Sequence, residues 1–184
     1  MSEPNISILP DRGVIAISGD EARSFLQGIV SNDTEKVTPE QAGYGAFLTP
    51  QGKYLFDFFM AEFGNQIFME TERERIPDFI NRLSLYKLRA KVDMEDVSSG
   101  FCVIAAYGTG ALDALSLPAT AGACSKNGSG IAFTDPRLVE AGARLIQPLG
   151  KTDFPAFELA EPDAYDAHRI TLGLPDSSRD LIVD

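Results

Sequence analysis

The chain has 184 residues, of which 44% are hydrophobic and 23% charged, as expected for one globular domain or two small lobes with a buried core. Sixteen Lys and Arg against 27 Asp and Glu give a formal net charge of -11, which argues against general attraction to nucleic acid or to an anionic membrane surface. No stretch approaches the ~18 apolar residues of a membrane span, and the first residues carry no targeting pattern. We therefore expect a cytoplasmic protein.

Cysteine and histidine are too scarce for several catalytic classes. Cys102 and Cys124 stand alone without a CxxC partner, and His168 is the single histidine. A Cys/His metal cage is therefore excluded, and we expect no metal site. A Ser-His-Asp hydrolase is also disfavoured, because no GxSxG motif accompanies His168.

The elements predicted in chain order begin with a capping-box spacing at Ser18 and Glu21 and a helix over residues 19–30. A meander of three strands follows, with one turn at Thr49–Gly52 and the next at Gly64 and Asn65; the strands cover residues 44–48, 54–63 and 66–71. Later segments are a helix over 76–88, an extended stretch to 97, strands at 101–106, 131–134 and 143–147, a short helix at 111–117, a loop at 119–130 and a helix at 163–172. Because strands and helices do not alternate strictly, an α+β fold is favoured.

Asp57 is a carboxylate inside a strongly apolar predicted strand. Alternation places it on one face with Leu55 and Phe59. Burying an unpaired charge there would cost on the order of several kcal/mol of folding free energy. One interpretation is a pocket carboxylate that binds a ligand amine or moves a proton. The other is an aspartate bonded to backbone amides or paired with an arginine.

Lys87, Arg89 and Lys91 alternate with apolar residues, so an extended segment would place all three cations on one face. In an acidic protein this is a candidate anion site, for which arginine supplies paired hydrogen bonds. A solvated sheet edge that resists aggregation is the alternative interpretation.

Asn32 and Asp33 directly follow the first predicted helix, where capping and turn formation is the slightly favoured role. Four further residues suit a heteroaromatic ligand, because tyrosine rings supply walls and glutamine an amide; they are Tyr44, Gln51, Tyr54 and Tyr86. The alternative interpretation is structural, because tyrosines at the ends of strands and helices commonly lie at the rim of a hydrophobic core.

Four blocks taken in order carry a family resemblance. They are Phe25–Gly28 followed by Ser31–Asp33, then YGAFLTPQGKYLFDFF from Tyr44 to Phe59, LYKLRAKV from Leu85 to Val92, and HRITLGLPDSSRDL from His168 to Leu181. This order resembles the YgfZ-type folate-binding proteins. These are relatives of the glycine cleavage T-protein, an aminomethyltransferase, and they take part in iron-sulfur cluster assembly and repair.

The resemblance implies an aminomethyltransferase-like α+β fold whose lobes surround a central cavity that receives tetrahydrofolate. Asp57 is the nearest match to the aspartate that assists aminomethyl transfer in the T-protein. Asn32 matches the asparagine of the Thr-Asn-Asp block, and Arg89 matches the arginine of the Tyr-Lys-Leu-Arg block. With Tyr44 and Gln51, these residues form the expected folate site.

Two departures from the family pattern qualify that expectation. The T-protein usually has two adjacent aspartates where this sequence has Phe56 and Asp57, and the YgfZ-type hallmark Lys-Gly-Cys-Tyr-x-Gly-Gln-Glu is absent. We therefore expect a fragment that lacks the hallmark loop and the C-terminal barrel lobe. Its expected parts are a first folate-binding lobe over 1–98, a second small lobe over 99–150, and a returning helix with the start of the missing part over 151–184.

Three functions remain open at this stage. The first is a tetrahydrofolate-binding accessory protein whose partners are iron-sulfur cluster assembly proteins or cluster-containing enzymes. The second is a folate-dependent aminomethyl or one-carbon transferase, which needs a competent acid or base beside the folate. The third is a non-enzymatic interaction module with a vestigial folate cavity.

Overall fold

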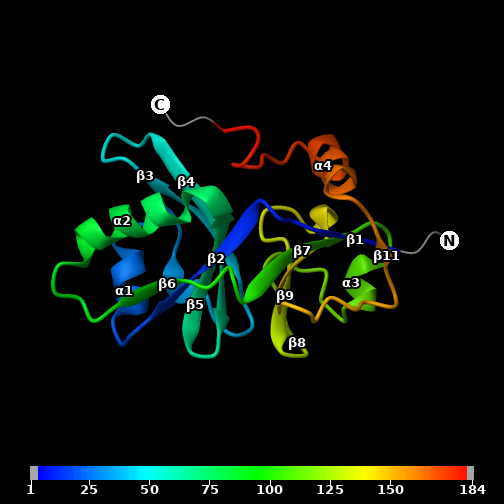
Figure 1. Cartoon of the computed structure of the whole chain (residues 1–184), viewed down its shortest axis with the longest axis horizontal. Helices are drawn as coiled ribbons and strands as arrows, with labels where there is room; N and C mark the ends of the chain where they lie inside the picture. The colour runs from blue at the N-terminus through cyan, green and yellow to red at the C-terminus, as the bar shows by residue number, and fades with distance from the viewer. Residues whose placement is uncertain (1–3, 182–184) are drawn as a thin grey trace.

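Two β-sheets dominate the computed structural model, which describes residues 4–181 (Figure 1). The five-stranded sheet is antiparallel, with the order β3-β4-β5-β2-β6; its strands are β2 (Arg12–Ser18), β3 (Gly43–Leu48), β4 (Tyr54–Phe63), β5 (Gln66–Glu72) and β6 (Asp93–Asp96). The six-stranded sheet has the order β11-β1-β7-β10-β9-β8; its strands are β1 (Asn5–Ile8), β7 (Phe101–Tyr107), β8 (Cys124–Asn127), β9 (Gly130–Thr134), β10 (Ala143–Pro148) and β11 (Glu158–Leu159).

The helices are short and lie between strands or after them. They are α1 (Ala22–Gln27), α2 (Ile76–Lys87), α3 (Ala111–Ala114) and α4 (Pro162–Thr171), with 3-10 turns at Thr34–Lys36, Arg73–Arg75 and Val139–Ala141. This mixture confirms the α+β fold class. Within residues 4–181, no helix combines the length and the apolar character that a membrane crossing requires.

The five-stranded sheet buries both of its faces. On one face, Ile15 and Ile17 of β2 pack in a cluster with Phe79 and Leu83 of α2. On the other face, β2 presents its alternate residues to the six-stranded sheet, and this shared core includes Val14, Phe59, Phe68, Phe133 and Ile146. The pleat of β4 divides its residues in the same way, which turns Asp57 and Phe59 toward the second sheet. Leu55 lies in the α2-facing cluster instead, because the β3–β4 register shifts near it.

The predicted meander is confirmed, since β3, β4 and β5 begin and end within one residue of the expected limits. The first helix is shorter than predicted. Glu21 occupies its N-cap without a side-chain capping bond, and its carboxylate accepts a hydrogen bond from the Lys91 backbone N–H at 2.8 Å. The expected capping box is therefore wrong, because a contact with a distant loop takes the glutamate.

Four strands were not predicted, and one of them, β11, has only two residues. β1 is only four residues long, and β2 is almost entirely buried, so neither shows a clear alternation of polar and apolar residues. The glycine-rich segment predicted as a loop contains β8, which pairs with β9 across a turn at Gly128, where φ is +56°. The glycines of this segment do mark turns, as predicted. The short strand β8 was missed because it carries few apolar residues.

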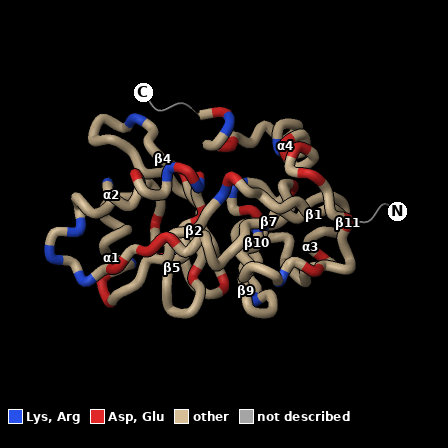
Figure 2. Tube along the Cα trace, in the orientation of Figure 1, with Lys and Arg blue, Asp and Glu red and all other residues tan. Residues whose placement is uncertain are grey.

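The basic segment Lys87–Lys91 differs from the prediction. α2 continues through Lys87, Leu88 has φ 45°, the Ala90 N–H donates to the Lys87 carbonyl, and β6 begins only at Asp93. Lys87 therefore ends α2, and Arg89 and Lys91 lie on the loop that follows, so the three cations do not share one face of a strand. Figure 2 shows Lys and Arg on this loop at the outer end of the molecule.

The proposed lobe limits at 98/99 and 150/151 stay predictions. The sheets do show how the segments are interwoven, because β1, from the first segment, pairs with β7 of the second. β11, from the third segment, pairs in parallel with β1.

Candidate functional site

The core between the two sheets ends in a cluster of charged and phenolic side chains. Asp57 lies there on β4, with 4% of its surface exposed. One carboxylate oxygen, Oδ2, accepts a hydrogen bond of 2.6 Å from the Tyr44 hydroxyl. The other, Oδ1, is buried and has no hydrogen-bond partner among the described residues. This oxygen is an acceptor available to a ligand or to water.

Tyr44 reaches Asp57 because β3 and β4 are neighbours in register. Ala46 lies opposite Asp57 and Tyr44 opposite Phe59, so the Tyr44 side chain spans the diagonal to the carboxylate. Burial and the charge of Asp57 raise the pKa of Tyr44 well above its ordinary value. The phenol therefore keeps its proton and donates a hydrogen bond to the carboxylate.

A groove of about 480 Å³ opens beside Tyr44. Its walls come from the segment between α1 and β3, from the start of β3, from the loop before β8 and from the loop after β9; they include Asn32, Lys36, Thr38, Gln41, Gly43, Tyr44, Ala121 and Arg137. A volume of this size lies within the range of small-molecule sites. Asp57 is not in the wall itself but lies behind Tyr44.

Asn32 fixes the loop after α1 against β3. Its Nδ2 donates to the Tyr44 carbonyl at 2.6 Å, and its Oδ1 accepts from the Asp33 N–H at 2.7 Å. A Cβ on Gly45 would lie 3.3 Å from the Asn32 Cβ, so the small residue lets this loop approach the strand. Asp33 caps the following 3-10 turn by accepting from the Glu35 N–H at 3.1 Å, which confirms the capping interpretation.

Arg137 also lines the groove. Its guanidinium lies 5.2 Å from the Tyr44 ring centroid and 4.7 Å from that of Phe59. Asp135 holds it through two hydrogen bonds from Nε and Nη2, at 3.1 and 2.8 Å. Burial opposes the charge of Arg137, but the bonds to Asp135 outweigh this and raise the pKa of Arg137. A fixed cation therefore faces the tyrosine ring.

A chain of buried ion pairs joins the two sheets. Glu70 on β5, which is fully buried, accepts a hydrogen bond from Arg12 Nε, and its Oε2 lies 3.8 Å from Arg144 Nη1 on β10. Arg144 also donates to the Tyr165 hydroxyl at 3.0 Å. Burial opposes the charge of Arg12, but the carboxylates of Glu70 and Asp176 raise its pKa. These ion pairs therefore link β2 and β5 of the first sheet to β10 of the second.

Comparison with known proteins agrees with this two-sheet fold. Residues 11–140 match the family described as the GCVT N-terminal domain. The chain belongs to this family. Among solved structures, the glycine cleavage system aminomethyltransferase T from Bartonella henselae has a similar fold, with a TM-score of 0.78 and 15% sequence identity over 95% of this chain and 52% of that one. The expected aminomethyltransferase-like α+β fold is thereby confirmed.

Curated relatives of this GCVT-family chain are named as iron-sulfur cluster assembly factors. The mitochondrial factor IBA57 homolog of Mycosarcoma maydis is 27% identical over 188 residues, which cover 94% of this chain and 44% of the relative. The human mitochondrial factor IBA57 is 28% identical over 190 residues, which cover 94% and 51% respectively. The chain thus spans about half the length of the curated relatives it matches.

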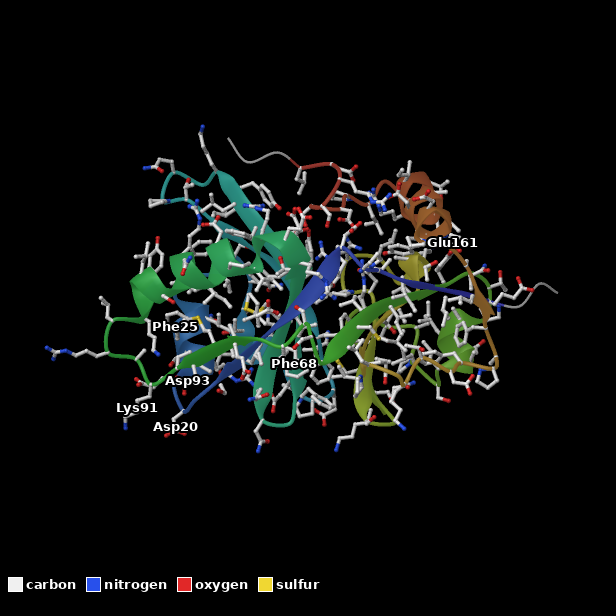
Figure 3. All side chains as sticks on the ribbon, viewed as in Figure 1. Asp20, Phe25, Phe68, Lys91, Asp93 and Glu161 are labelled. Atoms are coloured by element: carbon white, nitrogen blue, oxygen red, sulfur yellow. The ribbon has the colours of Figure 1, made fainter. Side chains whose placement is uncertain are left out.

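The GCVT-family chain brings together three of the five residues predicted for the site. Asn32 and Tyr44 line the groove, and Asp57 bonds to Tyr44. Gln51 is exposed in the turn between β3 and β4, and Arg89 is exposed on the loop after α2; neither lines the groove. Figure 3 shows Lys91 of that loop near Asp20 and Asp93 at the outer end of the molecule, whereas Phe68 lies between the sheets.

Sequence reasoning did not single out Arg12, Glu70, Arg137 or Arg144. Glu70 and Arg144 each interrupt an apolar strand, which is the signal that had marked Asp57. Arg137 lies in a loop and carries no such signal.

Tyr54 and Tyr86, also considered for the site, have different positions. The Tyr54 hydroxyl is buried. Burial and the charge of Asp57 raise the pKa of Tyr54, and the interaction with the Ser177 hydroxyl opposes this rise. Tyr86 is 44% exposed and packs edge-on against Phe47 on the α2 side of the sheet.

The described part of the chain contains no group of three or more His, Cys, Asp or Glu side chains that could hold a metal ion. Burial raises the pKa of Cys124 to about 12 and also raises the pKa of Cys102. Both thiols therefore stay protonated at neutral pH, and neither has the character of a nucleophile or a thiolate ligand.

Proposed function

We propose that this chain is the tetrahydrofolate-binding part of a YgfZ-type protein that serves iron-sulfur cluster assembly. The observation that carries the folate proposal is the buried Asp57 carboxylate, with one oxygen bonded to Tyr44 and the other without a partner, behind the wall of a groove. The assembly role is supported by the names of the curated relatives. Family membership and the ordered sequence blocks support the folate proposal as well.

The groove residues fit a heteroaromatic ligand with amide groups. Tyr44 supplies an aromatic surface, and Arg137 supplies a planar cation 5.2 Å from that ring. Asn32 presents an exposed amide at the rim. Asp57 Oδ1 would accept a hydrogen bond from a ligand N–H. Bound tetrahydrofolate would supply a nitrogen that carries a one-carbon unit, and the residues of this chain would bind and orient it.

Aminomethyl or one-carbon transfer is the second candidate, favoured by the same oxygen. A buried carboxylate with an unpartnered atom suits proton transfer to or from a substrate nitrogen. Product formed from an aminomethyl donor and tetrahydrofolate would establish this activity. Binding of folate without product would leave the accessory function.

The compartment stays a prediction. The sequence favours a cytoplasmic protein, while the names of the curated relatives assign those proteins to mitochondria.

Calorimetric titration with tetrahydrofolate under reducing conditions tests the binding proposal. Asp57→Asn keeps the shape of the side chain and removes the charge, and we expect it to weaken binding about tenfold, or about 1.4 kcal/mol. Gln51→Ala and Arg89→Ala are matched controls, because both residues are exposed and outside the groove. They should bind as the unaltered chain does.

Circular dichroism establishes that each variant is folded. Equal affinity in folded Asp57→Asn would remove Asp57 from the site. Failure of the intact natural protein to bind folate, together with co-purification of cluster-assembly proteins, would favour an interaction module with a vestigial cavity.

A further inference from the structure

Residues 175–180, called the strap below, follow α4 and return over the polar end of the core between the sheets. Figure 1 shows this red segment near the upper ends of the two sheets. Ser177 is its buried residue, 5% exposed, and the Ser177 hydroxyl accepts a hydrogen bond of 2.8 Å from Arg12 Nη1. Arg137 Nη1 donates to the Pro175 carbonyl at 3.0 Å. The strap thus contacts Arg12 of the buried ion-pair chain and Arg137 of the groove wall.

Polar contacts alone account for the attachment of the strap. The Asp176 carboxylate lies 3.6 Å from Arg12 Nη1, and Asp180 accepts from Arg169 of α4. No residue of the strap belongs to any of the three apolar clusters found in the described chain. A segment with few apolar contacts opens at a lower free energy than the sheets beneath it.

The strap meets a buried phenol. The buried Tyr54 hydroxyl interacts with the Ser177 hydroxyl of the strap, which opposes the rise of the Tyr54 pKa that burial and the charge of Asp57 cause. Asp57 Oδ1 is a buried acceptor without a hydrogen-bond partner in residues 4–181. A buried acceptor left unpaired carries a penalty that a ligand or solvent removes on entering.

We propose that residues 175–180 form a removable strap over Asp57, held closed by Arg12, Arg137 and Arg169, and that ligand reaches the carboxylate when the strap moves. Displacement would free Arg12 Nη1 from Ser177 and Asp176. The opened site would then present an N–H donor near the acceptor oxygen of Asp57. Such a pair fits a heterocyclic amide, which carries a carbonyl acceptor next to an N–H donor.

The assignment of that ligand rests on the proposed function, whereas the strap does not. A test without ligand is therefore needed, and tyrosine nitration by tetranitromethane supplies it. The chain has five tyrosines and no tryptophan, so peptide mapping can follow each ring separately. Tyr54 reports the space under the strap, and Tyr86, which is 44% exposed, is an internal reference on the other side of the sheet.

Asp176→Arg places a cation against Arg12 and should open the strap. We expect nitration of Tyr54 relative to Tyr86 to rise about tenfold, the shift that about 1.4 kcal/mol of lost attraction produces. Asp113→Arg is the matched control, because it makes the same charge change at an exposed position on α3. It should leave the ratio unchanged. If Asp176→Arg does not fold, the milder double variant Asp176→Asn with Ser177→Ala carries the same expectation.

An unchanged Tyr54 ratio in the folded strap variant would overturn the proposal, as would an equal rise in Asp113→Arg. Titration with tetrahydrofolate then separates the two ideas. Faster binding by the opened variant supports both. A rise in nitration with no folate binding by any variant leaves the strap standing and refutes the proposed ligand.

Discussion

Removal of the charge of Glu70 should destabilise the whole fold. Glu70 is fully buried between Arg12 on β2 and Arg144 on β10, so it neutralises guanidinium groups from both sheets. Glu70→Gln keeps the size of the side chain but removes the negative charge that neutralises the two buried arginines. Arg12 retains the Asp176 carboxylate at 3.6 Å, whereas the hydrogen bond of Arg144 goes to the neutral Tyr165 hydroxyl.

The expected loss follows from that imbalance. Removing one partner of a buried ion pair costs about 3–5 kcal/mol, and the remaining Asp176 places the expectation near the lower limit, at about 3 kcal/mol. For a chain of this length, each kcal/mol lowers the melting temperature by about 2–4 °C, so Glu70→Gln should melt about 6–12 °C lower.

Thermal and urea unfolding followed by circular dichroism would measure this loss. Glu95→Gln is the matched control, because Glu95 is exposed on β6 and its neutralisation should change stability by less than about 0.5 kcal/mol. A Glu70→Gln protein within about 1 kcal/mol of the unaltered chain would refute the reasoning, since it would mean that the arginines are adequately solvated or paired without Glu70.

Two further predictions concern the same cluster. Tyr44→Phe removes the donor to the buried Asp57 carboxylate and should cost about 1–3 kcal/mol in urea unfolding, whereas Tyr86→Phe should be nearly neutral; equal stabilities would contradict the importance of the 2.6 Å bond. Burial alone would raise the pKa of Asp176, but Arg12 and Arg144 lower it below the ordinary 3.8, so Asp176 stabilises the fold above about pH 4 and this contribution is lost as the pH falls through the lowered pKa. Asp176→Asn should therefore show a shallower decline of melting temperature between pH 5 and pH 2, and an identical decline would contradict the assignment.

The β3–β4 hairpin was predictable because its signals are local. Apolar runs, a proline and glycine turn and strand alternation specify the hairpin, and Asp57 was recognisable as a charge in an apolar strand. The register of that hairpin then brings Tyr44 to Asp57.

The remaining part of the candidate site depends on contacts between distant segments. Arg144 reaches Glu70 only because the second sheet packs on the first, and Ser177 reaches Arg12 across 165 positions of sequence. Arg89 was misplaced for a local reason, because α2 extends to Lys87 and Leu88 then adopts a positive φ. Alternation in the sequence cannot distinguish such a helix end from the start of a strand.

The crossing of the chain between β1 and β2 has a consequence for folding cooperativity. These strands are separated only by Leu9, Pro10 and Asp11, yet β1 belongs to the six-stranded sheet and β2 to the five-stranded sheet. Because the connection is so short, β1 and β2 cannot separate far from each other. Unfolding of one sheet should therefore destabilise the other. The two sheets should therefore unfold in a single calorimetric transition, with one nucleus of long-range contacts rather than two independent units.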